Sequence, residues 1–137
     1  MQIFNTMTRR KEEFTPQKEG EYRIYVCGPT VYNYIHIGNA RPMIVFDTLR
    51  RYLEYCGNKV YYVSNITDID DKLIKKGQEE GTSMQEVARK FEAEYIKDSD
   101  GLNVMAPTVR PRATEHIGEI IGIVKDLVES GHAYVAR

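Results

Sequence analysis

The first half of the chain alternates between two kinds of hydrophobic pattern. Residues 21–27, "EYRIYVC", are rich in β-forming residues and end at a Gly-Pro turn signal, which predicts a strand that runs into a loop. Residues from about 39 to 56 have apolar positions at helical spacing, and Gly57 is expected to end this helix. Residues 59–63, "KVYYV", predict a second strand, so the order indicates a βαβ unit with parallel strands. The predicted apolar stripe of the helix consists of Val45, Leu49, Tyr52, Leu53 and Cys56.

Two further amphipathic helices are predicted in the second half. Ser83 and Glu86 form a candidate capping box ahead of an apolar face. Another helix is expected to start near Thr114 and to end before Gly131. The apolar face of the first helix is Met84, Val87, Ala88, Phe91 and Tyr95, and that of the second is Ile117, Ile120, Ile121, Val124, Leu127 and Val128.

This second helix and the segment after it complete the prediction of fold class. Gly118 and Gly122 are unfavourable inside a helix, so a close packing partner is expected beside them. Residues 132–136, "HAYVA", predict another strand, and the chain stops in the middle of it. The predicted class is therefore α/β, and the fold is expected to be incomplete.

Composition narrows the class of protein but does not identify a partner. A chain of 137 residues is about one domain, and residues 1–137 contain no linker that would indicate a second one. A net charge of −1 provides no global attraction to nucleic acid or to an acidic membrane. No stretch reaches the roughly 18 apolar residues of a membrane span, so no membrane partner is expected. Two cysteines without an apolar leader fit a reduced cytoplasmic protein, with Cys56 interpreted as a core residue.

The candidate chemistry is concentrated in residues 26–42, "VCGPTVYNYIHIGNARP". Ligands of open α/β sheets bind beyond the carboxyl ends of the strands, where this stretch is predicted to lie. A helix beginning near Gly38 would offer free N–H groups to a phosphate, while His36 could donate a hydrogen bond and Arg41 could add charge. Taken singly, a histidine is more often solvated, a cysteine such as Cys27 is more often a small buried hydrophobe, and an arginine in a first helical turn is more often solvated. Neither a Walker A pattern nor GxGxxG is present.

The acidic run after the second predicted strand has two readings. Asp68, Asp70 and Glu79 have the spacing of positions 1, 3 and 12 of a calcium-binding loop. Such a loop needs an oxygen ligand and a glycine at positions 5 and 6, where this chain has Lys72 and Leu73. A helix-capping role for Asp68 or Asp70 is therefore favoured over calcium.

Five blocks in the same order resemble the cysteinyl-tRNA synthetases, a family within the class I aminoacyl-tRNA synthetases. The resemblance implies that residues 1–137 are the N-terminal part of a catalytic nucleotide-binding domain, the first half of a Rossmann-like fold with parallel strands and flanking helices. The blocks are "IFNTMTRRKEEFTP" at 3–16, "YVCGPTVYNYIHIGNARP" at 25–42, "VSNITDIDDKLIKK" at 63–76, "PRATEHIGEII" at 111–121 and "GHAYVA" at 131–136.

The resemblance also implies roles for individual residues. Cys27 matches one of four zinc ligands, and the metal would select cysteine over serine because a soft thiolate is the better ligand. His36 and Asn39 match the catalytic residues, and Gly28 and Thr67 match the cysteine-binding pocket. The family motif is His-Ile-Gly-His, and Asn39 stands in place of its last histidine. The residues implied to bind ATP, with magnesium, are His36, Ile37, Gly38 and Asn39.

The implied activity is the ligation of cysteine to its tRNA through a cysteinyl-adenylate, with cysteine, ATP and the cysteine tRNA as partners. The other three zinc ligands and the Lys-Met-Ser-Lys-Ser loop of the family are absent from residues 1–137. The isolated chain is therefore expected to be inactive or nearly so, and to self-associate through uncovered edges. Two alternatives stay open: a cysteine-activating ligase of the mycothiol pathway, and a non-catalytic truncated paralogue that acts as a binding module. The block at 3–14, "IFNTMTRRKEEF", favours the tRNA enzyme over the mycothiol enzyme.

Overall fold

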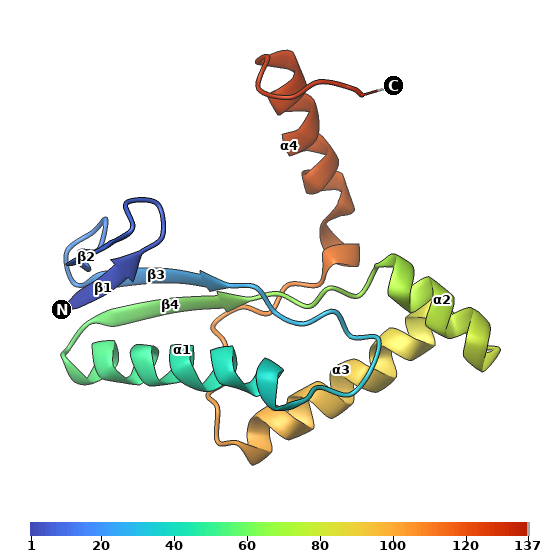
Figure 1. The fold of residues 1–137 in the computed structure, drawn as a ribbon, viewed down its shortest axis with the longest axis horizontal. Helices are drawn as coiled ribbons and strands as arrows, with labels where there is room; N and C mark the ends of the chain where they lie inside the picture. Colours follow the sequence, from blue (N-terminus) through green and yellow to red (C-terminus); the bar gives the residue numbers. More distant parts are fainter. Residues whose placement is uncertain (137) are drawn as a thin grey trace.

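The centre of the molecule is the predicted βαβ unit. The computed structural model describes residues 1–136. Strand β3 (Glu21–Val26) pairs in parallel with strand β4 (Lys59–Ser64), and helix α1 (Ile37–Tyr55) connects them and covers one face of this small sheet (Figure 1). The α/β class and the parallel pairing are confirmed. Parallel strands cannot be joined by a tight turn, so the crossover helix is required by the topology.

Helix α1 buries only part of the predicted stripe: Leu49 and Leu53 pack against the sheet as predicted, and the other three members do not. Leu53 is buried against Val60 and Tyr62 of β4, and Phe46 and Leu49 pack beside it. The spacing of 46, 49 and 53 is that of one helical face. Residues 45, 52 and 56 lie on a row rotated away from the sheet, and their side chains are exposed. The interpretation of Cys56 as a core residue is therefore wrong.

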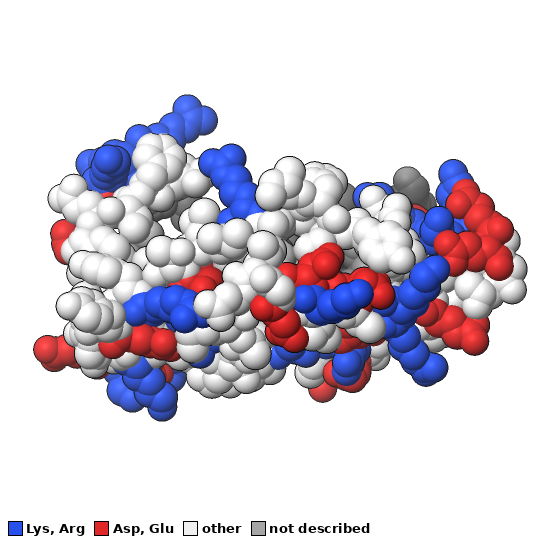
Figure 2. All heavy atoms as spheres, turned by 90° about the horizontal axis from the view of Figure 1, so that it is seen from below, with Lys and Arg blue, Asp and Glu red and all other residues white. Residues whose placement is uncertain are grey.

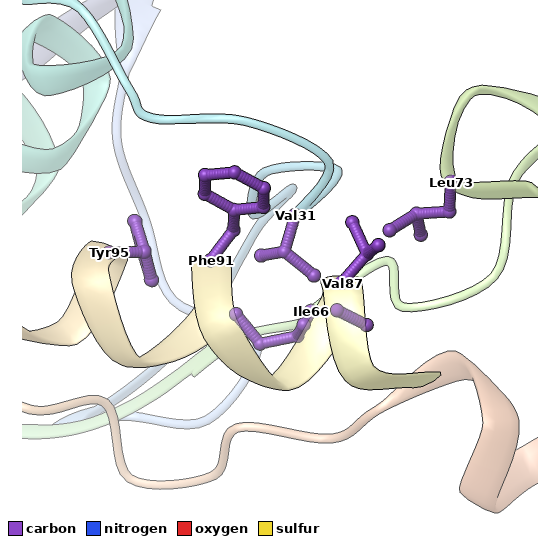
Figure 3. Packing of buried hydrophobic residues seen from close by; sticks show 7 residues of the cluster. Val31, Ile66, Leu73, Val87, Phe91 and Tyr95 are labelled. Carbon is purple, nitrogen blue, oxygen red and sulfur yellow. The ribbon is translucent and has the colours of Figure 1, made fainter. Parts of the chain in front are cut away.

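A second core forms where two later helices meet the loops that follow β3 and β4. Helix α2 (Asp71–Glu80) and helix α3 (Met84–Gly101) pack against each other, and α3 buries the face predicted for it (Figure 3). Ser83 and Glu86 form the predicted capping box at the start of α3. The buried members of this core are Val31, Ile66, Leu73, Val87, Ala88, Phe91 and Tyr95.

The chain then returns beside β4 and ends in a protruding helix. Val109 and Arg112 form isolated parallel bridges with Val63 and Ile66. Residues 109–112 therefore lie beside β4 as a short extension of the sheet. A short 3₁₀ helix, η1 (Ala113–His116), leads into helix α4 (Ile117–Glu129), which rises away from the body of the molecule (Figure 1).

Two expectations about this last part are wrong. The apolar stripe of α4 is exposed, and no atom of another part of the chain lies within 4 Å of a Cβ built on Gly118 or Gly122, so these glycines have no close packing partner among the described residues. Residues 132–136 form no strand, because a strand requires a hydrogen-bonded neighbour and this segment has none within residues 1–136.

A small hairpin that the sequence pattern did not indicate completes the fold. Strands β1 (Gln2–Asn5) and β2 (Arg10–Glu13) pair antiparallel at the end of the molecule where β3 starts (Figure 1). Phe14, which follows β2, stacks at a tilt on Tyr22 with ring centroids 5.0 Å apart. None of the helices in the described part of the chain has both the length and the apolar content that crossing a membrane would need.

Candidate functional site

The loops that follow the two parallel strands are held together at the carboxyl ends of the strands. The Thr67 N–H donates to the Pro29 carbonyl (3.1 Å), and the Val31 N–H donates to the Thr67 carbonyl (3.2 Å). The Gly28 N–H donates to the Asn65 side-chain oxygen (2.9 Å). This edge of the sheet is where ligands of open α/β folds bind, as the sequence predicted.

A pocket at this edge brings Cys27 and the start of α1 together. Cys27 and Gly28 from the end of β3 line it on one side, and Gly38 and Asn39 from the first turn of α1 line it on another. The Cys27 thiol is exposed and reduced. The two candidate elements of the sequence therefore share one pocket. The other described residues that line it include Tyr62, Ser64, Tyr95, Ser99 and Arg110.

His36 caps the N-terminus of α1, and this fixes its ring. The ring Nδ1 accepts from the Gly38 N–H (2.9 Å), and the Asn39 side-chain oxygen accepts from the His36 N–H (3.1 Å), which is a reciprocal capping box. Since Nδ1 is an acceptor, the neutral ring carries its proton on Nε2, on an exposed side chain. His36 thus keeps one free donor, and Asn39 keeps its NH₂ group.

Gly38 is required by the position of this ring. A Cβ built on Gly38 would lie 2.6 Å from Cε1 of His36, which is closer than real Cβ contacts allow. The glycine lets the imidazole lie across the helix start and still accept the Gly38 N–H. The residue type at 38 therefore has a local structural reason in addition to the close approach of a ligand that the sequence suggested.

Three of the residues that the resemblance implied do not line the pocket that holds Cys27. His36 and Ile37 face a neighbouring open hollow, which Lys97 and Asp98 of α3 also line. Thr67 lies in the loop behind the pocket wall, where its backbone pairs with the loop after β3. The structure therefore brings Cys27, Gly28, Gly38 and Asn39 together, and it places the other three around them.

The pocket is lined mainly by neutral groups, with one basic side chain. Arg110 lies with its guanidinium 5.8 Å from the centre of the Tyr95 ring. Burial raises the pKa of Tyr95 and also that of Tyr62, so both phenols stay neutral at physiological pH. Arg110 is the only Asp, Glu, Lys, Arg or His side chain among the described residues that line this pocket. The sequence analysis singled out Arg41 instead, which does not line it.

The described residues do not form a metal centre by themselves. Within residues 1–136 no three His, Cys, Asp or Glu side chains gather in a way that could hold an ion. Asp70 caps α2 by accepting from the Lys72 N–H (2.9 Å), and Asp68 accepts from the Thr114 N–H (3.0 Å). The capping interpretation of the acidic run is confirmed for Asp70, the N-cap of α2. Cys27 can supply a single thiolate ligand.

Sequence reasoning missed Asn65, Tyr95 and Arg110. Asn65 could have been found from its place, because it directly follows β4 and the loop after that strand was expected at the site. Tyr95 was predicted, but only as a core residue of α3. Arg110 lies in an irregular segment more than seventy positions along the chain from Cys27, and no local pattern indicates that it returns to the pocket.

The charges on the surface are mixed. Figure 2 shows Lys and Arg side chains interspersed with Asp and Glu across the face that it views, so this face has no extended basic area. Oppositely charged side chains also pair along α1, such as Arg51 with Asp47 (2.6 Å). This face has no broad electrostatic attraction for nucleic acid.

Comparison with known proteins gives a consistent result. The family model described as "tRNA synthetases class I (C) catalytic domain" matches residues 13–137. The chain is 59% identical over 134 residues to a cysteine–tRNA ligase of Lachnoclostridium phytofermentans, which covers 98% of the chain and 28% of that protein. It is 58% identical over all 137 residues to a cysteine–tRNA ligase of Clostridioides difficile (30% of that protein), and 58% identical over 134 residues to one of Lachnospira eligens (28%). The chain thus spans less than a third of the length of these relatives.

Proposed function

The chain belongs to the family of class I (C) tRNA synthetase catalytic domains, and from this premise we propose that it is the N-terminal part of a cysteine–tRNA ligase. The observation that carries the proposal is the shared pocket of Cys27 and the first turn of α1. One wall offers a thiol whose thiolate suits a sulfur-selective metal, and the other offers the N-terminus of α1 and the NH₂ group of Asn39, which suit a phosphate. The curated relatives named cysteine–tRNA ligase support this assignment.

The nucleotide end of the proposed site is the His36-to-Asn39 corner. In the proposed reaction the carboxylate of cysteine attacks the α-phosphorus of ATP and pyrophosphate leaves, and a hydroxyl of the tRNA then takes the cysteinyl group from the adenylate with release of AMP. His36 donates from Nε2 and Asn39 from its side-chain NH₂ group to the phosphate oxygens, with the dipole of α1 behind them. Ile37 contributes a backbone N–H group of the same turn, and Gly38, whose own N–H is bonded to His36 Nδ1, allows the close approach of the nucleotide. Magnesium accompanies the ATP as part of the substrate.

The amino-acid end is the Cys27 wall. Cys27 would be one of four ligands that hold a zinc ion, and the metal would supply selectivity for the soft thiolate of cysteine over the hydroxyl of serine. The other three ligands come from outside residues 1–137, in agreement with the single thiolate at the pocket. Gly28 and Thr67 shape the loops around the bound cysteine, since their backbones join the ends of β3 and β4.

Since three of the proposed zinc ligands come from outside residues 1–137, only a longer protein is expected to be active. ATP–pyrophosphate exchange is measured with cysteine, on the 137-residue chain and on a protein that continues to the length of the relatives. Exchange that depends on cysteine is expected in the longer protein alone, with serine as the inactive control. Absence of exchange from the longer protein would contradict the proposed function, and exchange by the short chain would contradict this expectation. The reaction, with the tRNA as one of its substrates, is proposed to take place in the cytoplasm.

A further inference from the structure

Asn65 connects the wall that carries Cys27 to the rest of the site. Its side-chain oxygen accepts from the Gly28 N–H at 2.9 Å, and its NH₂ group lies 3.3 Å from Oγ1 of Thr67. The side chain is half-buried, between the loop after β3 and the loop after β4. A Cβ built on Gly28 would lie 1.7 Å from the Asn65 backbone oxygen, so the two segments are in direct contact.

The bond to Gly28 controls the orientation of Cys27. The Gly28 N–H belongs to the peptide group whose other end is the Cα of Cys27, and a peptide group is rigid and planar. A fixed N–H direction therefore fixes one of the two peptide planes that meet at the Cα of Cys27, and so restricts the orientation of its side chain. Without an acceptor at 65, this donor would be left without its partner, and the loop would rotate to satisfy it.

The nucleotide corner does not depend on this bond. His36 and Asn39 are fixed by their own reciprocal capping box at the start of α1. The described contacts of Asn65 reach Gly28 and Thr67, but not residues 36–39. One pocket thus has two walls that are held by separate sets of hydrogen bonds.

We propose that Asn65 is a positioning residue for the amino-acid end of the site: its amide sets the direction of the Cys27 thiol, and with it the affinity for cysteine but not for ATP. The inference rests on the proposed function. It concerns a residue that does not line the Cys27 pocket and that acts through Gly28.

The test uses the full-length protein and two substitutions that differ in one hydrogen bond. Asn65→Ala removes both bonds, whereas Asn65→Asp keeps an oxygen to accept from the Gly28 N–H. In cysteine-dependent exchange, Asn65→Ala is expected to raise the KM for cysteine about tenfold with the KM for ATP unchanged, and Asn65→Asp to restore most of the loss. Asn58→Ala is the matched control, because Asn58 also bonds a backbone group through its amide (Leu53 carbonyl, 3.1 Å) but far from the pocket. Equal effects on both substrates, or no rescue by aspartate, would overturn the proposal.

A second readout does not depend on activity. The rate of Cys27 alkylation by iodoacetamide, read by peptide mass spectrometry, reports the exposure and direction of the thiol in each variant. Asn65→Ala is expected to change this rate about threefold or more, and Asn65→Asp and Asn58→Ala to leave it near the wild-type value. An unchanged rate in Asn65→Ala would overturn the inference even if the enzyme were active. If the wild-type protein showed no exchange but the variants showed these alkylation rates, the proposed function would be contradicted. The positioning role of Asn65 toward Cys27 would still stand.

Discussion

At the scale of single residues, two glycines of the site lie in close contacts that leave no room for a Cβ, one with backbone and one with a side chain. Gly28 lies against the Asn65 carbonyl, and Gly38 lies under the His36 ring. Neither glycine has a positive φ, so the requirement is for space and not for a left-handed backbone. Glycine at these two positions allows the two strand-end loops and the cap of α1 to approach closely.

Gly28→Ala is expected to destabilise the chain by about 1–3 kcal/mol, because the new Cβ would overlap a backbone atom that no rotamer change can move. Urea unfolding followed by circular dichroism measures the free energy of unfolding. Gly118→Ala is the matched control: nothing lies within 4 Å of its Cβ, so it is expected to stabilise α4 by up to about 1 kcal/mol. A neutral Gly28→Ala would mean that the two loops are not in contact in solution.

How far the site could be predicted also depends on the residue. The rule that ligands bind at the carboxyl ends of parallel strands was enough to place Cys27 beside Asn39. The same rule could not show that the His36 ring turns toward its own helix start, because this depends on a side-chain rotamer and a reciprocal cap. Arg110 reaches the pocket only through tertiary folding, which has no signature in the sequence near it.

At the scale of elements, the start of α3 is a pH-sensitive cap. Hydrogen bonds from the Thr82 hydroxyl and from the backbone and hydroxyl of Ser83 lower the pKa of Glu86 to about 2, from the ordinary 4.5. A carboxyl whose pKa is depressed by folding adds stability above its unfolded pKa, and this contribution is lost as the pH falls through the folded value. The cap is therefore complete above about pH 5 and is lost between about pH 4.5 and pH 2.

Glu86→Gln is expected to lower the free energy of unfolding at pH 7, with a difference from wild type that shrinks as the pH falls from 4.5 to about 2. Urea titrations at a series of pH values measure this. Glu19→Gln, an exposed position outside the helices, is the control and should show no such convergence. A difference that is constant down to pH 2 would show that the carboxylate charge has no part in the cap.

An ion pair between Arg112 and Glu92 joins η1 to α3, and its two side chains differ in burial. Arg112 forms a two-pronged contact with Glu92 of α3 (2.7 Å from Nη2 and 3.0 Å from Nε) and also contacts Glu115 at 3.0 Å. These contacts raise the pKa of Arg112 above its ordinary value. The Glu92 side chain is only 9% exposed, whereas that of Arg112 is 43% exposed. Removing Arg112 is therefore expected to change the free energy of unfolding by a different amount from removing Glu92.

Arg112→Leu is expected to cost about 2 kcal/mol or more, because it leaves a buried carboxylate without its partner. Glu92→Leu is expected to cost less, since the Arg112 guanidinium can reach water and keeps Glu115. A double-mutant cycle by urea unfolding measures both, and the double variant should recover part of the loss. Equal costs for the two single variants would contradict the asymmetry.

Helices α3 and α4 and the β1–β2 hairpin show which sequence patterns predict a helix or a strand, and which also predict its burial. The stripe of α3 predicted both a helix and its burial, because its partners Val31, Ile66 and Leu73 lie within the described chain. The stripe of α4 predicted only the helix, since helical spacing is a local property and burial requires a partner. The strands of the β1–β2 hairpin are short and largely polar, so periodicity could not reveal them.

At the scale of the whole molecule, the parallel sheet is covered on one face by α1, and the opposite face is largely open (Figure 1). Tyr25 and Tyr61, on the two strands, are 61% and 41% exposed. Purely parallel sheets in proteins are covered on both faces, and β3 also has one edge without a partner among the described residues. In a protein of the relatives' length, further chain would be available to cover these surfaces.

The isolated 137-residue chain is therefore expected to self-associate through α4 and the open sheet face. Ile121 and Val124 are 50% and 52% exposed in the middle of the α4 stripe, and an apolar surface of this extent is normally covered. Sedimentation equilibrium over a range of concentrations measures the effect. The double substitution Ile121→Glu and Val124→Lys should shift the chain toward monomer, whereas Val45→Lys, at an equally exposed apolar position on α1 (53%), should not. A wild-type chain that stays monomeric at every concentration would contradict the expected self-association and show that the exposed stripe of α4 is tolerated in water.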